Sequence, residues 1–117
     1  HFAGVLVGPT DALAAADVIA LPSRTEGMPG VLIEAGLSGV AAVASDVGGV
    51  SEIVRDGRTG LLLPPGDASA LADGLRRALA QRDALGPAAR RHCLAHFEIA
   101  PVAAQWAALG RSLALLD

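Results

Sequence analysis

The chain has 117 residues, of which 52% are hydrophobic but only 3% aromatic, and its formal net charge is −3. This length suits one small domain, and the lack of a basic stripe argues against a nucleic-acid partner. With Cys93 as the single cysteine, no intrachain disulfide can form, which fits a reducing, cytosolic compartment. No apolar run reaches the roughly 20 residues of a membrane helix, so we expect a soluble protein.

The first half of the chain alternates between strands and short helices. Apolar runs bounded by glycine or proline predict a strand end at 2–7 and buried strands at 17–21, 40–44 and 61–63. Between them we expect a short helix after Thr10 as N-cap, a second helix with Pro29 as its first residue, and one helical turn at 51–54.

The second half of the chain predicts helices only. Asp67 is expected to cap an amphipathic helix with one leucine face, made by Leu71, Leu75 and Leu79. The pair at 86–87, glycine and proline, is expected to separate it from a further helix that runs to about residue 95. The last helix is predicted to start at Pro101 and to present an apolar face of Val102, Trp106, Leu109 and Leu113.

Strands that alternate with helices predict an α/β fold, in which a partial doubly wound (Rossmann-like) parallel sheet has helices on its faces. Small side chains, many of them alanine, suit the close packing of helices on such a sheet. Ligands of these folds bind beyond the carboxyl ends of the strands. The loops expected there are 22–30 and 45–49, together with the loop after Leu63.

One of these loops reads EGMPGVLIE, at 26–34, and places two glutamates around two glycines. The free N–H groups of a helix that starts here suit a phosphate or a sugar hydroxyl. Glu26 and Glu34 flank that position, and carboxylates accept hydrogen bonds from hydroxyl pairs. A nucleoside diphosphate sugar has this layout. In the alternative interpretation, Glu26 only balances the helix dipole and Glu34 is a solvated helix residue.

The residues around this loop resemble the donor site of glycosyltransferase family four, whose enzymes have the two-domain GT-B fold. The resemblance begins with LPSRTEGMPGVLIEA at 21–35 and covers nearly the whole chain. Further matching blocks follow in order: ASDVGG at 44–49, SEIV at 51–54, DGRTGLL at 56–62, PGD at 65–67 and LA at 71–72. The tail at 97–113 also looks like the closing helical segment of that family.

The resemblance implies roles for the residues of this loop. Glu34 would hold the ribose hydroxyls of the donor, and Glu26, as the catalytic residue, would contact the transferred sugar. A substrate-binding segment would lie against sugar and diphosphate, formed by Gly27, Met28, Pro29, Gly30 and Val31. The pair Gly48 and Gly49 would fall in the second loop of the same cleft.

The resemblance also implies the reaction. A sugar would pass from a nucleoside diphosphate sugar to an acceptor hydroxyl with retention at the anomeric carbon, and without a cofactor or a metal. Residues 1–117 would be the nucleotide-sugar donor-binding domain, in the form of the second half of a GT-B domain, with the N-terminal acceptor domain absent. The acceptor stays unassigned. We expect a cytoplasmic enzyme, with peripheral membrane attachment of the full-length protein left open.

Truncation would have two consequences. This chain alone is expected to be inactive, and to self-associate through the surface that the missing parts would cover. Two other functions stay open: a sugar-nucleotide epimerase of related fold, and a non-catalytic interaction module. His92 and His96 have the i, i+4 spacing of a metal pair. Because no third ligand is evident, we favour a surface helix over a metal site there.

Overall fold

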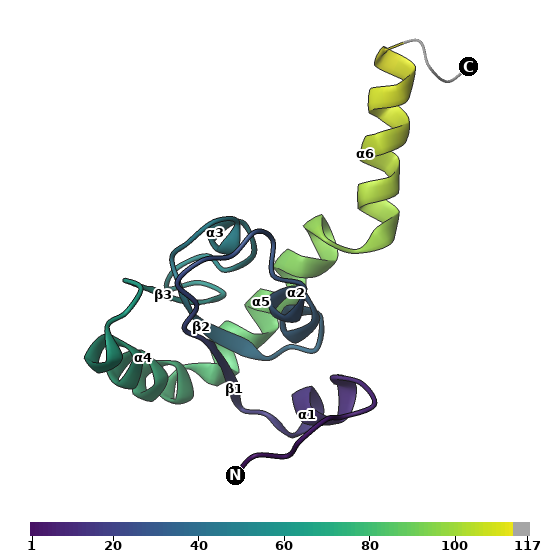
Figure 1. Cartoon of the computed structure of the whole chain (residues 1–117). Helices are drawn as coiled ribbons and strands as arrows, with labels where there is room; N and C mark the ends of the chain where they lie inside the picture. Colours follow the sequence, from purple (N-terminus) through teal and green to yellow (C-terminus); the bar gives the residue numbers. More distant parts are fainter. Residues whose placement is uncertain (114–117) are drawn as a thin grey trace.

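Three short parallel strands form the centre of the molecule, in the order β1, β2, β3 (Figure 1). The structure is a computed structural model, and it describes residues 1–113. The strands are β1 (Val18–Leu21), β2 (Ala41–Ser45) and β3 (Gly60–Leu63). Val18 is aligned with Ala41 across the first pair of strands, and Ser45 is aligned with Leu63 across the second. The predicted parallel sheet is confirmed.

Within residues 1–113, helices connect the strands and then follow them. They are α1 (Thr10–Ala15), α2 (Gly30–Leu37), α3 (Val50–Ile53), α4 (Ala68–Ala80), α5 (Arg82–His96) and α6 (Ile99–Ser112). The strands β1 and β2 are joined through α2, and β2 and β3 through α3. Because these strands are parallel, each connection must return the chain across the length of the sheet.

Strand β2 has a core on each of its faces, because neighbouring side chains of a strand point to opposite sides. Ala42 and Ala44 pack with residues of α2, α3 and α5, among them Leu32 and Cys93. On the other face Ala41 and Val43 pack with Leu71 and Leu75 of α4 and with residues that include Ala78 and Leu85, whereas Leu79, predicted on the same apolar face, is exposed. The sheet is therefore covered by helices on both faces, as the alternating pattern predicts.

Small residues allow the helices to approach the sheet and each other closely. A Cβ atom added to Gly74 of α4 would lie 2.9 Å from Leu63 Cδ1 and 3.0 Å from Val43 Cγ1. A Cβ atom on Gly36 of α2 would overlap the Cys93 sulfur of α5. The alanine-rich, aromatic-poor composition thus has a direct structural use, since it brings two layers of helices into close contact with a strand that is mostly alanine.

The first helical cap and the first strand were predicted wrongly. Residues 2–7 do not form a strand: Phe2 and Val5 are fully exposed, and no described strand pairs with this segment. A strand is stabilised by hydrogen bonds to a neighbour, and this segment has none within residues 1–113. Thr10 lies inside α1 rather than at its cap, which is Pro9, and no side chain caps this helix.

Two further helix boundaries differ from the predictions. Pro29 is the N-cap of α2 rather than its first residue. The break between α4 and α5 lies at Gln81, and the pair at 86–87 is inside α5. Gly86 packs against the carbonyl group of Gly39, where a Cβ atom would not fit, so its glycine serves close packing rather than a helix end.

Helix α6 projects away from the rest of the molecule (Figure 1), and none of its described residues is buried. It begins at Ile99, two residues before the predicted start. The exposed fraction of Trp106 is 69%, and its apolar neighbours Leu109 and Leu113 are also exposed. Within the described residues, no helix is both long enough and apolar enough to cross a bilayer.

Candidate functional site

The loops that follow β1 and β2 meet at the carboxyl edge of the sheet. The backbone N–H of Gly49 donates a hydrogen bond of 2.7 Å to the carbonyl oxygen of Gly27. A Cβ atom on Gly49 would lie 3.2 Å from Cε of Met28, and one on Gly48 would overlap the carbonyl group of Glu26. The fold therefore brings together the two glycine-containing loops that the sequence placed in one cleft.

Helix α2 begins directly behind this junction. Its N-cap, Pro29, is buried and has extended backbone with ψ 109°, and no side chain caps the helix end. Leu32 N donates to Pro29 O at 3.1 Å, while the N–H groups of Gly30 and Val31 lie at the open end of the helix. The first N–H groups of a helix have no partner within it, and together they present a positive partial charge.

The space at the helix start is open. A Cβ atom on Gly30 would meet a single atom, Oε1 of Glu34, at 3.9 Å. The carboxylate of Glu34 thus lies beside the first turn of α2, and this residue is exposed. Met28 and Val31 are exposed as well, with 47% and 41% of their surface accessible. A ligand at this helix end could therefore reach both the backbone and the Glu34 carboxylate.

Glu26 is held differently from Glu34. Its side chain accepts a hydrogen bond of 2.7 Å from the hydroxyl group of Ser23, and the residue is half-buried. The contact spans three residues of the loop and restricts the orientation of the carboxylate. Ser23 was not singled out from the sequence, although it lies in the matching block at 21–35. One carboxylate at this site is therefore oriented by the loop, while the other projects from the helix.

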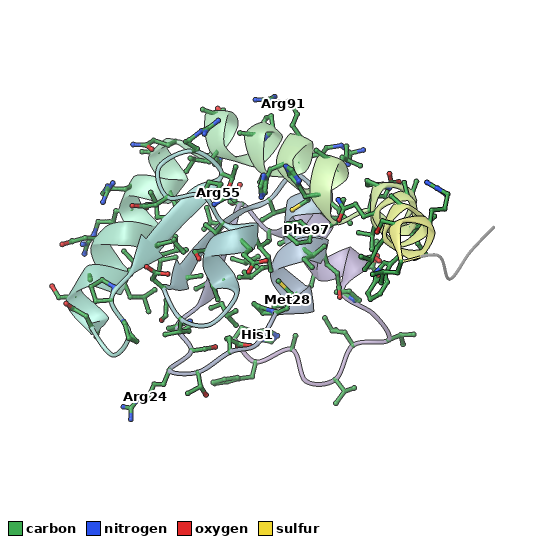
Figure 2. All side chains as sticks on the ribbon, turned by 90° about the horizontal axis from the view of Figure 1, so that it is seen from above. His1, Arg24, Met28, Arg55, Arg91 and Phe97 are labelled. Carbon is green, nitrogen blue, oxygen red and sulfur yellow. The ribbon has the colours of Figure 1, made fainter. Side chains whose placement is uncertain are left out.

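A hollow of about 240 Å³ lies beside these loops, at the carboxyl ends of all three strands. Neither Glu26 nor Glu34 lines it. Its walls come from the loops after β1 and β3 and from the start of α4: Pro22, Arg24, Ser45, Leu63, Pro64, Gly66, Asp67, Ala68 and Leu71. The sequence predicted that the loop after Leu63 lies at this edge of the sheet. It did not predict that any of these side chains contacts a ligand. Figure 2 shows the side chain of Arg24 extending outward from its loop.

The remaining candidates have structural explanations. The rings of His92 and His96 are in contact, tilted by 49° with their centroids 4.8 Å apart, and His92 Nε2 lies 2.8 Å from the carbonyl oxygen of Glu52. Within residues 1–113, no group of three or more potential metal-ligating side chains is found. Cys93 is buried between α2 and α5, and burial raises the pKa of its thiol because the charged form loses its hydration.

The fold and the site together define a class of protein. A parallel sheet with helices on both faces, with its loops meeting over an uncapped helix start, is the architecture of α/β domains that bind ligands at the carboxyl ends of their strands. The chain belongs to the group 1 glycosyl transferases: the model of this family matches residues 1–81.

Several curated relatives of the chain are named as glycosyltransferases. Over 71 residues the chain is 48% identical to D-inositol 3-phosphate glycosyltransferase of Nocardia farcinica, an alignment that covers 61% of this chain and 16% of that protein. It is 40% identical over 102 residues to alpha-maltose-1-phosphate synthase of Mycolicibacterium smegmatis, with 80% of this chain and 26% of that protein covered. The chain therefore spans roughly a sixth to a quarter of the length of these relatives.

Solved structures agree with the fold. Sucrose-phosphate synthase of Thermosynechococcus elongatus matches with a TM-score of 0.79 and 37% identity over 90% of this chain and 27% of that one. HepE of Anabaena, solved in complex with UDP-glucose, matches with a TM-score of 0.77 and 28% identity over 86% of this chain and 29% of that one. These structural neighbours are GT-B glycosyltransferases, so the predicted fold class is confirmed.

Proposed function

We propose that this chain forms part of the donor-binding domain of a retaining glycosyltransferase of family four. The observation that carries the proposal is the open N-terminus of α2, which directly follows the junction of two loops and lies in the sequence between Glu26 and Glu34. The match to HepE in complexes with UDP and with UDP-glucose supports a nucleoside diphosphate sugar as the donor.

The proposed roles follow from how each group is held. The N–H groups at the start of α2 would bind the diphosphate, since a helix N-terminus favours an anion. Glu34, beside that end and exposed, would accept hydrogen bonds from the ribose hydroxyls. Glu26, oriented by Ser23, would contact the transferred sugar. Together with Gly27, Met28, Pro29, Gly30 and Val31, these residues form the proposed site.

In the proposed reaction, the bond between the anomeric carbon and the diphosphate oxygen breaks, and the electron pair leaves with the nucleoside diphosphate. The acceptor hydroxyl oxygen forms the new bond on the same face of the sugar, and its proton is released. Negative charge grows on the leaving oxygen during this step. Helix N–H groups aimed at that oxygen stabilise this charge without reorganising, which is the main catalytic contribution that this chain would make.

The proposed enzyme is larger than this chain. We assign residues 1–117 to the donor-binding domain, and the acceptor-binding domain to the part of a full-length protein that lies outside this sequence. The single cysteine supports a reducing, cytoplasmic compartment. The reaction needs no cofactor beyond the donor itself.

The test is a transfer assay on the full-length protein with nucleoside diphosphate sugars and a panel of hydroxyl acceptors. NMR of the product should show the anomeric configuration of the donor, and inversion would refute the retaining mechanism. An altered sugar nucleotide formed without any acceptor would instead indicate the epimerase. If no sugar nucleotide binds, and alanine at Glu26 and Glu34 changes nothing, the interaction module is the better interpretation.

A further inference from the structure

A second hollow, of about 880 Å³, lies away from the donor loops and has three arginines in its walls. One wall is the turn at 55–59, which precedes β3, and the other is formed by the last turns of α5. This turn is at the amino end of β3, whereas the donor loops follow the carboxyl ends of the strands. The hollow is therefore separate from the proposed donor site.

The charge balance of the hollow favours an anion. Arg55, Arg58 and Arg91 line it, which is three of the nine basic residues in a chain with a net charge of −3. The one carboxylate in its walls belongs to Asp56, whose Oδ1 accepts a hydrogen bond of 3.0 Å from Leu62 N. The C-terminal end of α5 adds roughly half a negative charge. The positive charge of the three guanidinium groups exceeds the negative charge of Asp56 and of the helix end together.

Among the described residues, no ion pair engages the guanidinium groups of this hollow. The ion pairs found within residues 1–113 join Arg76 to Asp73 and Arg82 to Asp17, so neither involves an arginine of the hollow. A guanidinium presents a planar fork of donors that matches phosphate oxygens. Arg55 and Arg91, which are labelled in Figure 2, line the hollow from different elements, the turn at 55–59 and α5. An anion between the walls could therefore contact arginines from both.

The backbone under these side chains is fixed before any ligand binds. Thr59 is buried, and its hydroxyl accepts a hydrogen bond of 2.8 Å from Arg55 N. Arg58 N and Thr59 N both donate to the carbonyl oxygen of Arg55, at 3.0 and 2.9 Å. Such a closed turn lowers the entropy lost on binding, because only the arginine side chains remain to be ordered.

The histidines complete the second wall. His92 Nε2 lies 2.8 Å from the carbonyl oxygen of Glu52, and since a carbonyl can only accept, Nε2 carries the proton. This contact ties the end of α5 to α3. The ring of His96 contacts that of His92 in a tilted arrangement and lies on the same wall. Both walls are thus connected to the body of the domain and can keep their spacing when the hollow is occupied.

We propose that this hollow binds a phosphate group, which belongs either to a soluble phosphorylated molecule or to the headgroup of an anionic lipid. The site is independent of the proposed donor site, because it shares none of its residues. The phosphate would lie between Arg55, Arg58 and Arg91, with Asp56 turned to the backbone of β3.

The experiment uses the full-length protein and two probes. Calorimetry at low salt measures the binding of inorganic pyrophosphate, and sedimentation measures binding to phosphatidylglycerol vesicles, with phosphatidylcholine vesicles as the neutral reference. The variant R58Q/R91Q removes two cations from the hollow. The control R76Q/R77Q removes two cations from exposed positions on α4, so that the net charge changes equally in both proteins. Melting curves check that both variants are folded.

We expect R58Q/R91Q to weaken binding of at least one probe by about tenfold or more, because two charge-assisted contacts are lost. The control variant R76Q/R77Q should change the affinity for the same probe by less than about twofold. Arginine-dependent binding of pyrophosphate alone identifies a soluble ligand, and binding of anionic vesicles identifies a lipid headgroup. Because pyrophosphate can also bind at the donor site, Gly30→Val should remove that part of the binding only, and the loss caused by R58Q/R91Q should be the same with and without Gly30→Val. Equal losses in the two double variants, or no binding of either probe, would overturn the proposal.

Discussion

Gly49 and Gly27 join the two loops of the candidate site through one hydrogen bond, from the N–H of Gly49 to the carbonyl oxygen of Gly27 at 2.7 Å. The adjacent Gly48 has a φ of +53°, in the left-handed region, and a Cβ atom there would overlap the carbonyl of Glu26. A Cβ atom on Gly49 would lie 2.7 Å from the carbonyl oxygen of Gly27, so Gly48 and Gly49 are both needed for the loops to meet, whatever ligand they bind.

This relationship predicts that Gly48→Ala destabilises the protein strongly. The left-handed backbone costs about 1–2 kcal/mol for alanine, and the steric overlap adds about 1–3 kcal/mol. The matched control is Gly57→Ala, at φ +74° with nothing within 4 Å of its added Cβ, which should cost the backbone term alone. Thermal unfolding of the full-length variants measures the difference, and equal losses would contradict the close contact between the loops.

Glu34→Ala should weaken donor binding in the full-length enzyme by about 1.5–3 kcal/mol, the range for hydrogen bonds to a charged group. Little stability should be lost, since Glu34 is exposed. Glu98→Ala, an exposed glutamate outside the donor loops, is the control. Calorimetry with the nucleoside diphosphate sugar measures both. Donor affinity that is the same for both variants would remove Glu34 from the ribose site.

Gly30→Val should separate donor binding from folding. The protein leaves room for the new side chain, because a Cβ atom at this position meets only Glu34 Oε1 at 3.9 Å. The valine would instead occupy the space in which a ligand approaches the start of α2. Melting temperature and donor affinity of the full-length protein are to be compared. A large loss of stability with donor binding retained would mean that Gly30 serves the turn rather than the ligand.

Cys93 should react slowly with alkylating reagents in the folded protein. The thiolate is the reactive form, and burial raises the pKa of this thiol, so less thiolate is present near neutral pH. The rate of alkylation should therefore increase as the pH rises. Unfolding the protein in denaturant should increase the rate further, because it exposes the thiol. Mass spectrometry of the peptide that carries Cys93 follows the modification. Equal rates in the folded and unfolded protein would contradict the packing of α5 on α2.

Local patterns were sufficient for most of the fold. The apolar runs at 17–21, 40–44 and 61–63 are short and bounded by glycine or proline, and each became a strand. Asp67 caps α4 through a hydrogen bond of 2.9 Å from Ala70 N, as its position predicts. The break at Gln81 could not be read locally, because the glycine at 86 is explained only by the carbonyl group of Gly39, 47 residues earlier in the chain.

In the candidate site, too, some features could be predicted from adjacent residues and others depend on residues that are distant in sequence. The loop at 26–34 was found from its own residues, since the glycines, the helix start and the glutamates are adjacent in sequence. The hollow with Ser45 and Leu63, and the cationic hollow with Arg58 and Arg91, combine residues from separate elements. Only the register of the sheet and the packing of α5 bring such residues together, so no local motif could indicate them.

Finally, the isolated chain should self-associate and should not transfer sugar. The exposed apolar face of α6 has no cover within residues 1–113, and the outer edge of β1 pairs with no described strand. Uncovered apolar surfaces and unpaired strand edges favour association. Without an acceptor domain, the advantage of positioning both substrates is lost, which in ideal cases is worth about 7–11 kcal/mol of barrier.

Light scattering on the purified chain should therefore show oligomers. The variant W106Q/L109Q, which makes the face of α6 polar, should reduce their size, whereas R76Q/R77Q on α4 should not. The α6 substitutions should leave the fold intact, because no described residue of this helix is buried. If the variant associates as strongly as the parent chain, association does not depend on α6, and the outer edges of β1 and β3 become the surfaces to test. A monomeric chain that turns over a nucleotide sugar would refute both the association and the need for a second domain.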